Sequence, residues 1–109
     1  MLKIGTLFSG IGAIEQALIK MNIEHEIVFA CDNGERELPI PREEIEKAIQ
    51  NMSPAESKKY IDKLYDELNK PNYMEQTYLY NYKLDKSNFH QDIRFLNGQI
   101  YKGSIDLLV

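Results

Sequence analysis

The sequence predicts an α/β protein in which parallel strands alternate with helices. Residues 2–34 follow the order strand, glycine turn, helix, strand and acid, which is the order of one βαβ unit. Strand-like runs return only near residues 88–92 and 105–109, so a long charged stretch separates the two halves of the expected sheet. The 109 residues leave room for one domain with a single modest core.

The expected βαβ unit begins with an apolar run at residues 2–8, typical of a strand buried on both faces. After the glycine turn, apolar residues recur at helical spacing, at Ile11, Ile14, Leu18 and Met21. The run EIVFAC at residues 26–31 is rich in β-branched and aromatic residues and predicts a second strand. Asp32 follows this strand, and the turn residues Asn33 and Gly34 come next.

A charged segment with helical signals follows, at approximately residues 35–75. The sequence SPAE at residues 53–56 combines a capping box with proline at the first helical position, so we expect a helix from there to about Leu68. Its apolar positions fall on one stripe, namely Tyr60, Ile61, Leu64, Tyr65 and Leu68. The tyrosine-rich stretch at residues 73–84 predicts a further helix.

Composition narrows the classes of function. A net charge of −4 and a pI near 5.2 argue against a domain that binds nucleic acid through its own basic surface. The single cysteine, Cys31, excludes an intramolecular disulfide and a multi-cysteine metal site, and it favours a reducing, cytoplasmic setting. The first apolar stretch is too short and too interrupted for a signal peptide or a membrane span, so we expect no membrane partner.

The stretch TLFSGIG at residues 6–12 places Ser9, Gly10 and Gly12 where a strand turns into a helix. Here the backbone can approach a ligand closely, and the helix N-terminus offers N–H groups to a carboxylate. Glu15 occupies the third glycine position of the dinucleotide fingerprint, which disfavours pyrophosphate binding. A tight turn without a ligand is the alternative interpretation.

Asp32 ends the second strand about 20 residues after the glycine turn. In nucleoside-binding α/β folds, an acid at this place accepts hydrogen bonds from both ribose hydroxyls. Beside Asn33 and Gly34, Asp32 taken alone would be interpreted as a turn residue. The glycine turn and Asp32 together favour a nucleoside site.

Four segments, in order, resemble the first motifs of the DNA cytosine-5 methyltransferases: LFSGIGAIEQAL, VFACD, FHQDI and YKGSIDLLV. They cover about half of the chain. The resemblance implies a partial, three-layer, Rossmann-like fold of the S-adenosylmethionine-dependent methyltransferases, with a helical insertion after the second strand at approximately residues 35–75. It also implies methyl transfer from S-adenosylmethionine to C5 of cytosine in DNA, in a bacterial or phage host cell.

The resemblance implies that nine residues bind S-adenosylmethionine: Phe8, Ser9, Gly10, Ile11, Gly12, Asp32, Asn33, Asp92 and Ile93. The first five would surround the methionine and ribose, and Asp32 would hold the ribose hydroxyls. Asp92 would accept a hydrogen bond from the adenine amino group, beside the backbone of Ile93; the alternative for Asp92 is an exposed loop acid. Asn33 stands where the family has an apolar residue that stacks on adenine, and Gly34 where it has an acid.

In the family, the catalytic Pro-Cys follows a strand of the I-D-L-L-V type. Residues 105–109 resemble that strand and have no cap after them, so we expect this chain to be an N-terminal portion that is inactive alone, with DNA bound by an absent C-terminal region. Cys31 lies in the second strand and is expected to be a buried structural thiol. His90 is expected to be a loop or strand-end side chain without a catalytic role.

Two other hypotheses remain. The first is a non-catalytic interaction or dimerisation module, in which the acidic helical insertion and an exposed sheet edge at residues 105–109 mediate self-association. The second is another nucleoside-binding α/β enzyme, such as a small-molecule methyltransferase or a nucleotide oxidoreductase. For the chain alone we expect an exposed edge and marginal stability or self-association.

Overall fold

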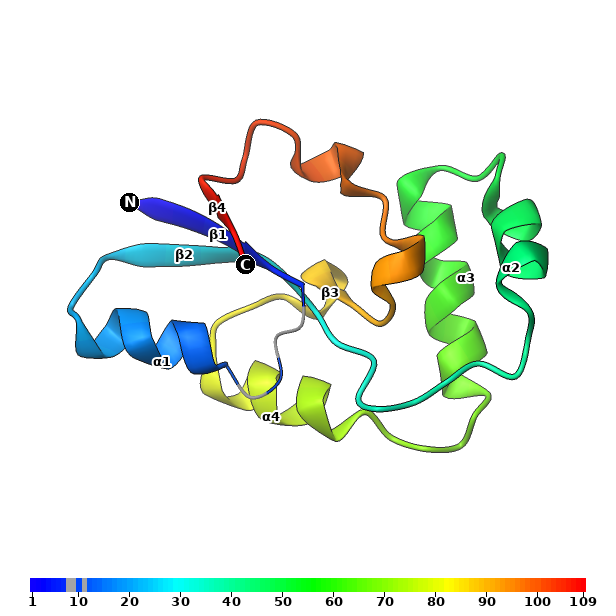
Figure 1. The fold of residues 1–109 in the computed structure, drawn as a ribbon, viewed down its shortest axis with the longest axis horizontal. Coiled ribbons are helices and arrows are strands. Elements are labelled where there is room, and N and C mark those ends of the chain that lie inside the picture. Colours follow the sequence, from blue (N-terminus) through cyan, green and yellow to red (C-terminus); the bar gives the residue numbers. More distant parts are fainter. Residues whose placement is uncertain (8–9, 11) are drawn as a thin grey trace.

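The computed structural model describes residues 1–7, 10 and 12–109. Its centre is a four-stranded sheet with the order β3-β2-β1-β4, in which all neighbouring strands are parallel (Figure 1). The strands are β1 (Leu2–Thr6), β2 (His25–Cys31), β3 (Phe89–His90) and β4 (Leu107–Leu108). The predicted α/β fold with parallel strands is confirmed, and its topology is Rossmann-like.

The first βαβ unit forms as predicted, with α1 (Ala13–Lys20) connecting β1 to β2. Helix α1 lies on the same side of the sheet as α4 (Tyr73–Asn81) (Figure 1). Glu15 of α1 is fully buried, and the Tyr78 hydroxyl of α4 donates to Glu15 Oε1 at 2.6 Å. Glu15, which occupies the third glycine position of the dinucleotide fingerprint, therefore links α1 to α4 on one side of the sheet.

The segment predicted to be a helical insertion, at approximately residues 35–75 and called the insertion here, contains α2 (Arg42–Ile49) and α3 (Pro54–Asp66), which stand at the opposite end of the molecule from α1 (Figure 1). The predicted capping box is present: Ser53 Oγ accepts from the Glu56 N–H at 3.2 Å, and Glu56 Oε1 accepts from the Ser53 N–H at 3.4 Å. Helix α3 ends at Asp66, slightly before the predicted Leu68. Asn69, in the loop that follows, takes a left-handed conformation with φ of 56°. The sequence pattern thus located the start of this helix better than its end.

Two apolar clusters stabilise the fold, one against the sheet and one inside the insertion. The sheet core consists of Ala30, Tyr78, Tyr82 and Phe89. The insertion core consists of Ile45, Ile61, Tyr65 and Phe95. The predicted apolar stripe of α3 contributes Ile61 and Tyr65 to the insertion core, and Phe95 comes from the segment that follows β3, so this core attaches the insertion to the sheet end.

Two predicted elements are longer than those observed. Helix α4 stops at Asn81 rather than near residue 84, because Tyr82 has extended backbone and its hydroxyl donates to the Gly12 carbonyl at 3.0 Å. Strand β3 stops at His90 rather than at residue 92. The Asp92 carboxylate accepts from the Arg94 N–H at 3.0 Å and caps the short 3₁₀ helix η2 (Ile93–Phe95), which turns the chain away from the sheet.

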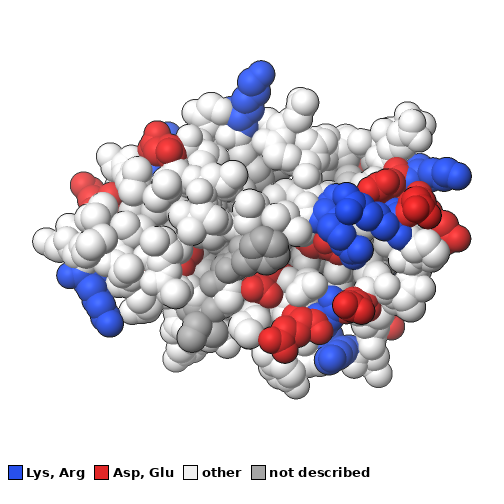
Figure 2. Space-filling model, viewed as in Figure 1, with Lys and Arg blue, Asp and Glu red and all other residues white. Residues whose placement is uncertain are grey.

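Strand β4 forms one edge of the sheet and pairs with β1. The apolar side chains along this edge are partly exposed: Leu107, Leu108 and Val109. The part of the chain that the structure describes therefore has the exposed edge that the sequence predicts, whereas self-association stays a prediction. On the face shown in Figure 2, most charged side chains gather on the side of the insertion. Among the described residues, every helix is too short or too polar to cross a bilayer.

His90 ends β3 as a buried side chain. Its Nε2 lies 2.6 Å from the Tyr101 hydroxyl oxygen, and its ring packs edge-on against Phe29. Burial, aided by the positive charge of Lys58, lowers the pKa of His90 from 6.5 to about 4. The imidazole is therefore neutral in the folded protein near neutral pH and has a structural environment, as the sequence predicted.

We expect the free energy of unfolding to fall as the pH is lowered from 6.5 towards 4, because the unfolded chain protonates His90 in this interval and the folded chain does not. The loss due to His90 at pH 4.5 amounts to roughly 2 kcal/mol. Urea unfolding at pH 7 and pH 4.5 measures it. The His90→Gln variant should lose clearly less stability over the same change, and an equal loss in both proteins would contradict the assignment.

Candidate functional site

The carboxyl ends of the parallel strands β1, β2 and β3 lie at the same end of the sheet, which is where open α/β sheets bind ligands. The three predicted parts of the site follow these ends: the glycine turn after β1, Asp32 after β2 and Asp92 after β3. Because β2 lies between β1 and β3, Asp32 has a central place in this row. The topology of the sheet thus brings the predicted residues together.

Gly10 and Gly12 both have positive φ, of 53° and 92°, a conformation that favours glycine. A Cβ added to Gly10 would meet no described atom within 4 Å. A Cβ added to Gly12 would lie 2.4 Å from the Tyr82 ring, so this glycine makes room for the residue after α4. The other predicted residues of the turn lie outside the described residues: Phe8, Ser9 and Ile11.

The Asp32 carboxylate joins the glycine turn to the end of β2. The Gly10 N–H donates to Asp32 Oδ2 and the Gly34 N–H donates to Asp32 Oδ1, each at 2.8 Å. The Asp32 N–H donates to the His90 carbonyl at 3.1 Å, which fixes this residue relative to β3. A carboxylate offers about four acceptor positions, and these two bonds from described residues occupy two of them.

The Asp92 carboxylate is buried and already accepts four hydrogen bonds. The Arg94 side chain donates to Oδ1 from Nε at 3.1 Å and to Oδ2 from Nη2 at 2.7 Å. The Arg94 N–H donates to Oδ1 at 3.0 Å, and the Tyr65 hydroxyl of the insertion donates to Oδ2 at 2.7 Å. Burial by itself would raise the pKa of Asp92, but the bonds from Arg94 and Tyr65 outweigh it and hold the pKa below its ordinary value.

A small pocket adjoins the ends of β2 and β3. It is lined by Leu7, Cys31, Asn33, Gln91, Asp92 and Ile93. Three of these residues are among those predicted to meet adenine, so the structure gathers them as the sequence implied. The volume is about 40 Å³, far below the roughly 300–1,000 Å³ of ligand pockets, so an adenine ring could enter only after neighbouring side chains move.

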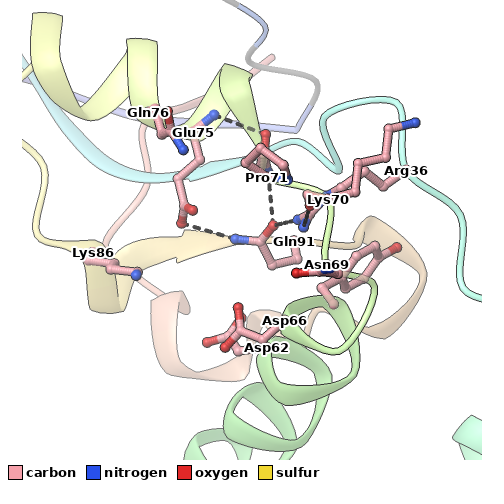
Figure 3. Close-up of a pocket in the computed structure, with 12 residues that line it drawn as sticks. Arg36, Asp62, Asp66, Asn69, Lys70, Pro71, Glu75, Gln76, Lys86 and Gln91 are labelled. Carbon is pink, nitrogen blue, oxygen red and sulfur yellow. Dashed lines mark hydrogen bonds between the residues drawn. The ribbon is translucent and has the colours of Figure 1, made fainter.

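A larger pocket of about 490 Å³ shares Gln91 with the small one. Figure 3 shows polar side chains of α3, of the loop after it and of the first turn of α4 around it. Gln91 Nε2 donates to Glu75 Oε2 at 2.9 Å, and Gln91 Oε1 accepts from Arg36 Nη2 and from Asn72 Nδ2. Both ends of this amide are therefore held by the surrounding side chains.

Four polar residues that the sequence patterns did not assign to the site lie near it in the structure: Arg36, Tyr65, Asn72 and Gln91. Tyr65 was expected only as part of an apolar stripe. A cap signature was present for Asn72, because Glu75 follows three residues later and the side chain accepts from the Glu75 N–H at 3.0 Å. Sequence spacing gave no signal for its second role, in which Asn72 Nδ2 donates to the Asp32 carbonyl at 2.9 Å.

Cys31 is buried at the end of β2, as predicted. Burial raises the pKa of its thiol to about 12, and the negative charges of Asp92 and Asp32 contribute in the same direction. Since the thiolate is the nucleophilic form, this environment suppresses the reactivity of Cys31. The residue therefore has the properties of a structural thiol.

Comparisons with protein-family models, with curated proteins and with solved structures find no match to this chain. Within the described residues, no group of three or more His, Cys, Asp or Glu side chains is placed to hold a metal ion. The function of the site is therefore inferred from its geometry and from the sequence motifs that meet there.

We expect Cys31 to react with iodoacetamide at pH 8 at least about 100-fold more slowly in the folded protein than in urea, because burial suppresses thiolate formation. Mass spectrometry of samples quenched at intervals measures the two rates, with a cysteine-containing peptide as the reference for the effect of urea. Alkylation of the folded protein at the peptide's rate would contradict the structural assignment.

Proposed function

We propose that this chain binds S-adenosylmethionine as the N-terminal, cofactor-binding part of a DNA cytosine-5 methyltransferase. The observation that carries the proposal is the 2.8 Å hydrogen bond from the Gly10 N–H to Asp32 Oδ2. It puts the glycine turn after β1 and the acid after β2 into one site, as in α/β folds that bind nucleosides. The sequence motifs around Gly10, Asp32 and Asp92 supply the choice of cofactor.

The ribose contact fits the geometry of Asp32. Its two backbone hydrogen bonds, from Gly10 and Gly34, hold the carboxylate in place, and the described donors leave each oxygen one further acceptor position, which we assign to a ribose hydroxyl. The described residues leave room for a ligand close to the backbone of Gly10, since none of their atoms would lie within 4 Å of a Cβ added there. In this proposal, Gly10 and Gly12, with Phe8, Ser9 and Ile11, surround the methionine and ribose.

The base contact requires a rearrangement. Asp92 can accept the adenine amino group only if one of its present donors turns away, since its four acceptor positions are in use. The Arg94 side chain is 39% exposed and can move into solvent, whereas Tyr65 is buried in the insertion core. In the proposed complex, Arg94 therefore releases Asp92, and Ile93 and Asn33 border the adenine.

The chemistry that the resemblance implies is methyl transfer to cytosine. In the family, a cysteine thiolate adds to C6 of a flipped-out cytosine and C5 accepts the methyl group that S-adenosylmethionine supplies; C5 then loses its proton as the C6–S bond breaks and the thiolate leaves. Cys31 does not provide this thiolate, because burial raises its pKa to about 12. In this proposal the chain binds the cofactor, and the nucleophile and the DNA contacts come from other residues.

A second candidate function is self-association through the β4 edge, which would make the α/β unit an interaction module. The observation that favours it is the partial exposure of Leu107, Leu108 and Val109 along an edge that pairs only with β1 among the described strands. Sedimentation over a range of protein concentrations distinguishes this candidate, since cofactor binding by itself requires no change in mass.

Calorimetric titration with S-adenosylmethionine tests the proposal. We expect saturable one-site binding, and we expect Asp32→Ala to weaken it at least about tenfold because hydrogen bonds to a charged acceptor are lost. Asp85→Ala is the matched control: Asp85 is exposed and also accepts a backbone N–H two residues later, from Ser87 at 2.9 Å. It removes the same charge and the same kind of turn away from the site.

Circular dichroism establishes that each variant is folded before the titrations are compared. Wild-type affinity in a folded Asp32→Ala variant would contradict the assignment of the ribose acid. The absence of binding by folded wild-type protein would contradict the proposed function of the chain. Binding of other nucleosides with the same affinity would favour a different nucleoside-dependent enzyme.

A further inference from the structure

The Asn72 side chain, near the end of the helical insertion, makes three hydrogen bonds. Only 4% of the residue is exposed. Its Nδ2 donates to the Asp32 carbonyl at 2.9 Å and to Gln91 Oε1 at 2.8 Å, while its Oδ1 accepts from the Glu75 N–H at 3.0 Å. Acceptors on one side and a donor on the other fix the orientation of the amide. Asn72 thereby connects the ends of β2 and β3 to the start of α4.

The turn after Asp32 is shaped to fit against Asn72. Gly34 has φ of 64°, and its N–H donates to Asp32 Oδ1 at 2.8 Å. A Cβ added to Gly34 would lie 2.3 Å from Asn72 Oδ1, so any side chain there would displace either Asn72 or the turn. Gly34 stands where the family has an acid, and the Asn72 side chain explains this difference because it leaves no room for a side chain at position 34.

Arg36 and Gln91 support the same arrangement from the side of the large pocket (Figure 3). Arg36 is 5% exposed; its Nε donates to the Asn33 carbonyl at 3.0 Å and its Nη1 to the Lys70 carbonyl at 2.9 Å. Its Nη2 donates to Gln91 Oε1, the atom that also accepts from Asn72. Because buried charges are costly unless hydrogen-bonded, these bonds resist movement of the loop after β2.

We propose that Asn72 is a positioning residue for the ribose-binding carboxylate of Asp32, through which the end of the helical insertion determines how strongly the site prefers ribose. The inference rests on the proposed function. Asn72 holds the Asp32 carbonyl from one side, and the turn that it packs against holds the Asp32 carboxylate from the other. Loss of the Nδ2 donor frees the main chain of Asp32 and misaligns its oxygens with the ribose hydroxyls.

The test compares binding of S-adenosylhomocysteine and of its 2′-deoxy analogue to the same protein by calorimetry. Asn72→Ser retains a side-chain oxygen that can cap α4 but removes the Nδ2 donor. Asn72→Asp retains the shape and the cap and also removes that donor, which provides a second, independent variant. Asn97→Ser is the matched control, because Asn97 is an exposed cap whose Oδ1 accepts from the Gln99 N–H at 3.0 Å.

In the wild type and in Asn97→Ser, we expect the 2′-deoxy analogue to bind at least about tenfold more weakly, since one hydrogen bond to a carboxylate is lost. In both Asn72 variants we expect this ratio to fall by about threefold or more, because Asp32 discriminates less when it is misaligned. A purely structural role of Asn72 would weaken both ligands equally and leave the ratio unchanged.

A folded Asn72→Ser or Asn72→Asp variant that keeps the wild-type ratio overturns the inference and leaves the proposed function intact. Absence of binding of either ligand by the folded wild type overturns the proposed function itself, and the inference with it. A ratio near one in the wild type overturns the assignment of Asp32 to the ribose, and therefore also the role of Asn72.

Discussion

The structure of the candidate site depends on one carboxylate that accepts two backbone hydrogen bonds. Asp32 Oδ2 holds the Gly10 N–H and Asp32 Oδ1 holds the Gly34 N–H, each at 2.8 Å. Through these bonds, a single side chain holds the turn after β1 and the turn after β2 together at the carboxyl ends of the strands. They also satisfy two backbone N–H groups of these turns, which lie outside the hydrogen-bond ladder of the sheet.

The helical insertion is joined to the carboxyl ends of β2 and β3 by buried polar contacts as well as by its apolar core. The Tyr65 hydroxyl donates to Asp92, Arg36 donates to the Asn33 carbonyl, and Asn72 donates to the Asp32 carbonyl. Buried polar groups of this kind stabilise one arrangement only when nearly all of their bonds are made. The insertion therefore constrains the residues that the motifs assign to ribose and adenine.

The parts of the fold that depend on local pattern could be predicted from the sequence. The βαβ order, the cap at Ser53 and the apolar face of α3 follow from residue spacing, because each is formed by neighbours in the chain. The bonds of Asn72 to Asp32 and of Tyr65 to Asp92 join residues 40 and 27 positions apart. No periodicity encodes such pairs, and the shortness of β3 likewise depended on how the Asp92 side chain was bonded.

A crystal structure of the chain grown with S-adenosylhomocysteine would decide whether Asp32 binds the ribose. We expect both ribose hydroxyls within about 3 Å of the Asp32 oxygens, with the bonds from Gly10 and Gly34 retained. We also expect Arg94 to leave Asp92 to admit the adenine. A nucleoside bound elsewhere, for example in the large pocket beside Gln91 and Glu75, with Asp32 untouched, would contradict this assignment.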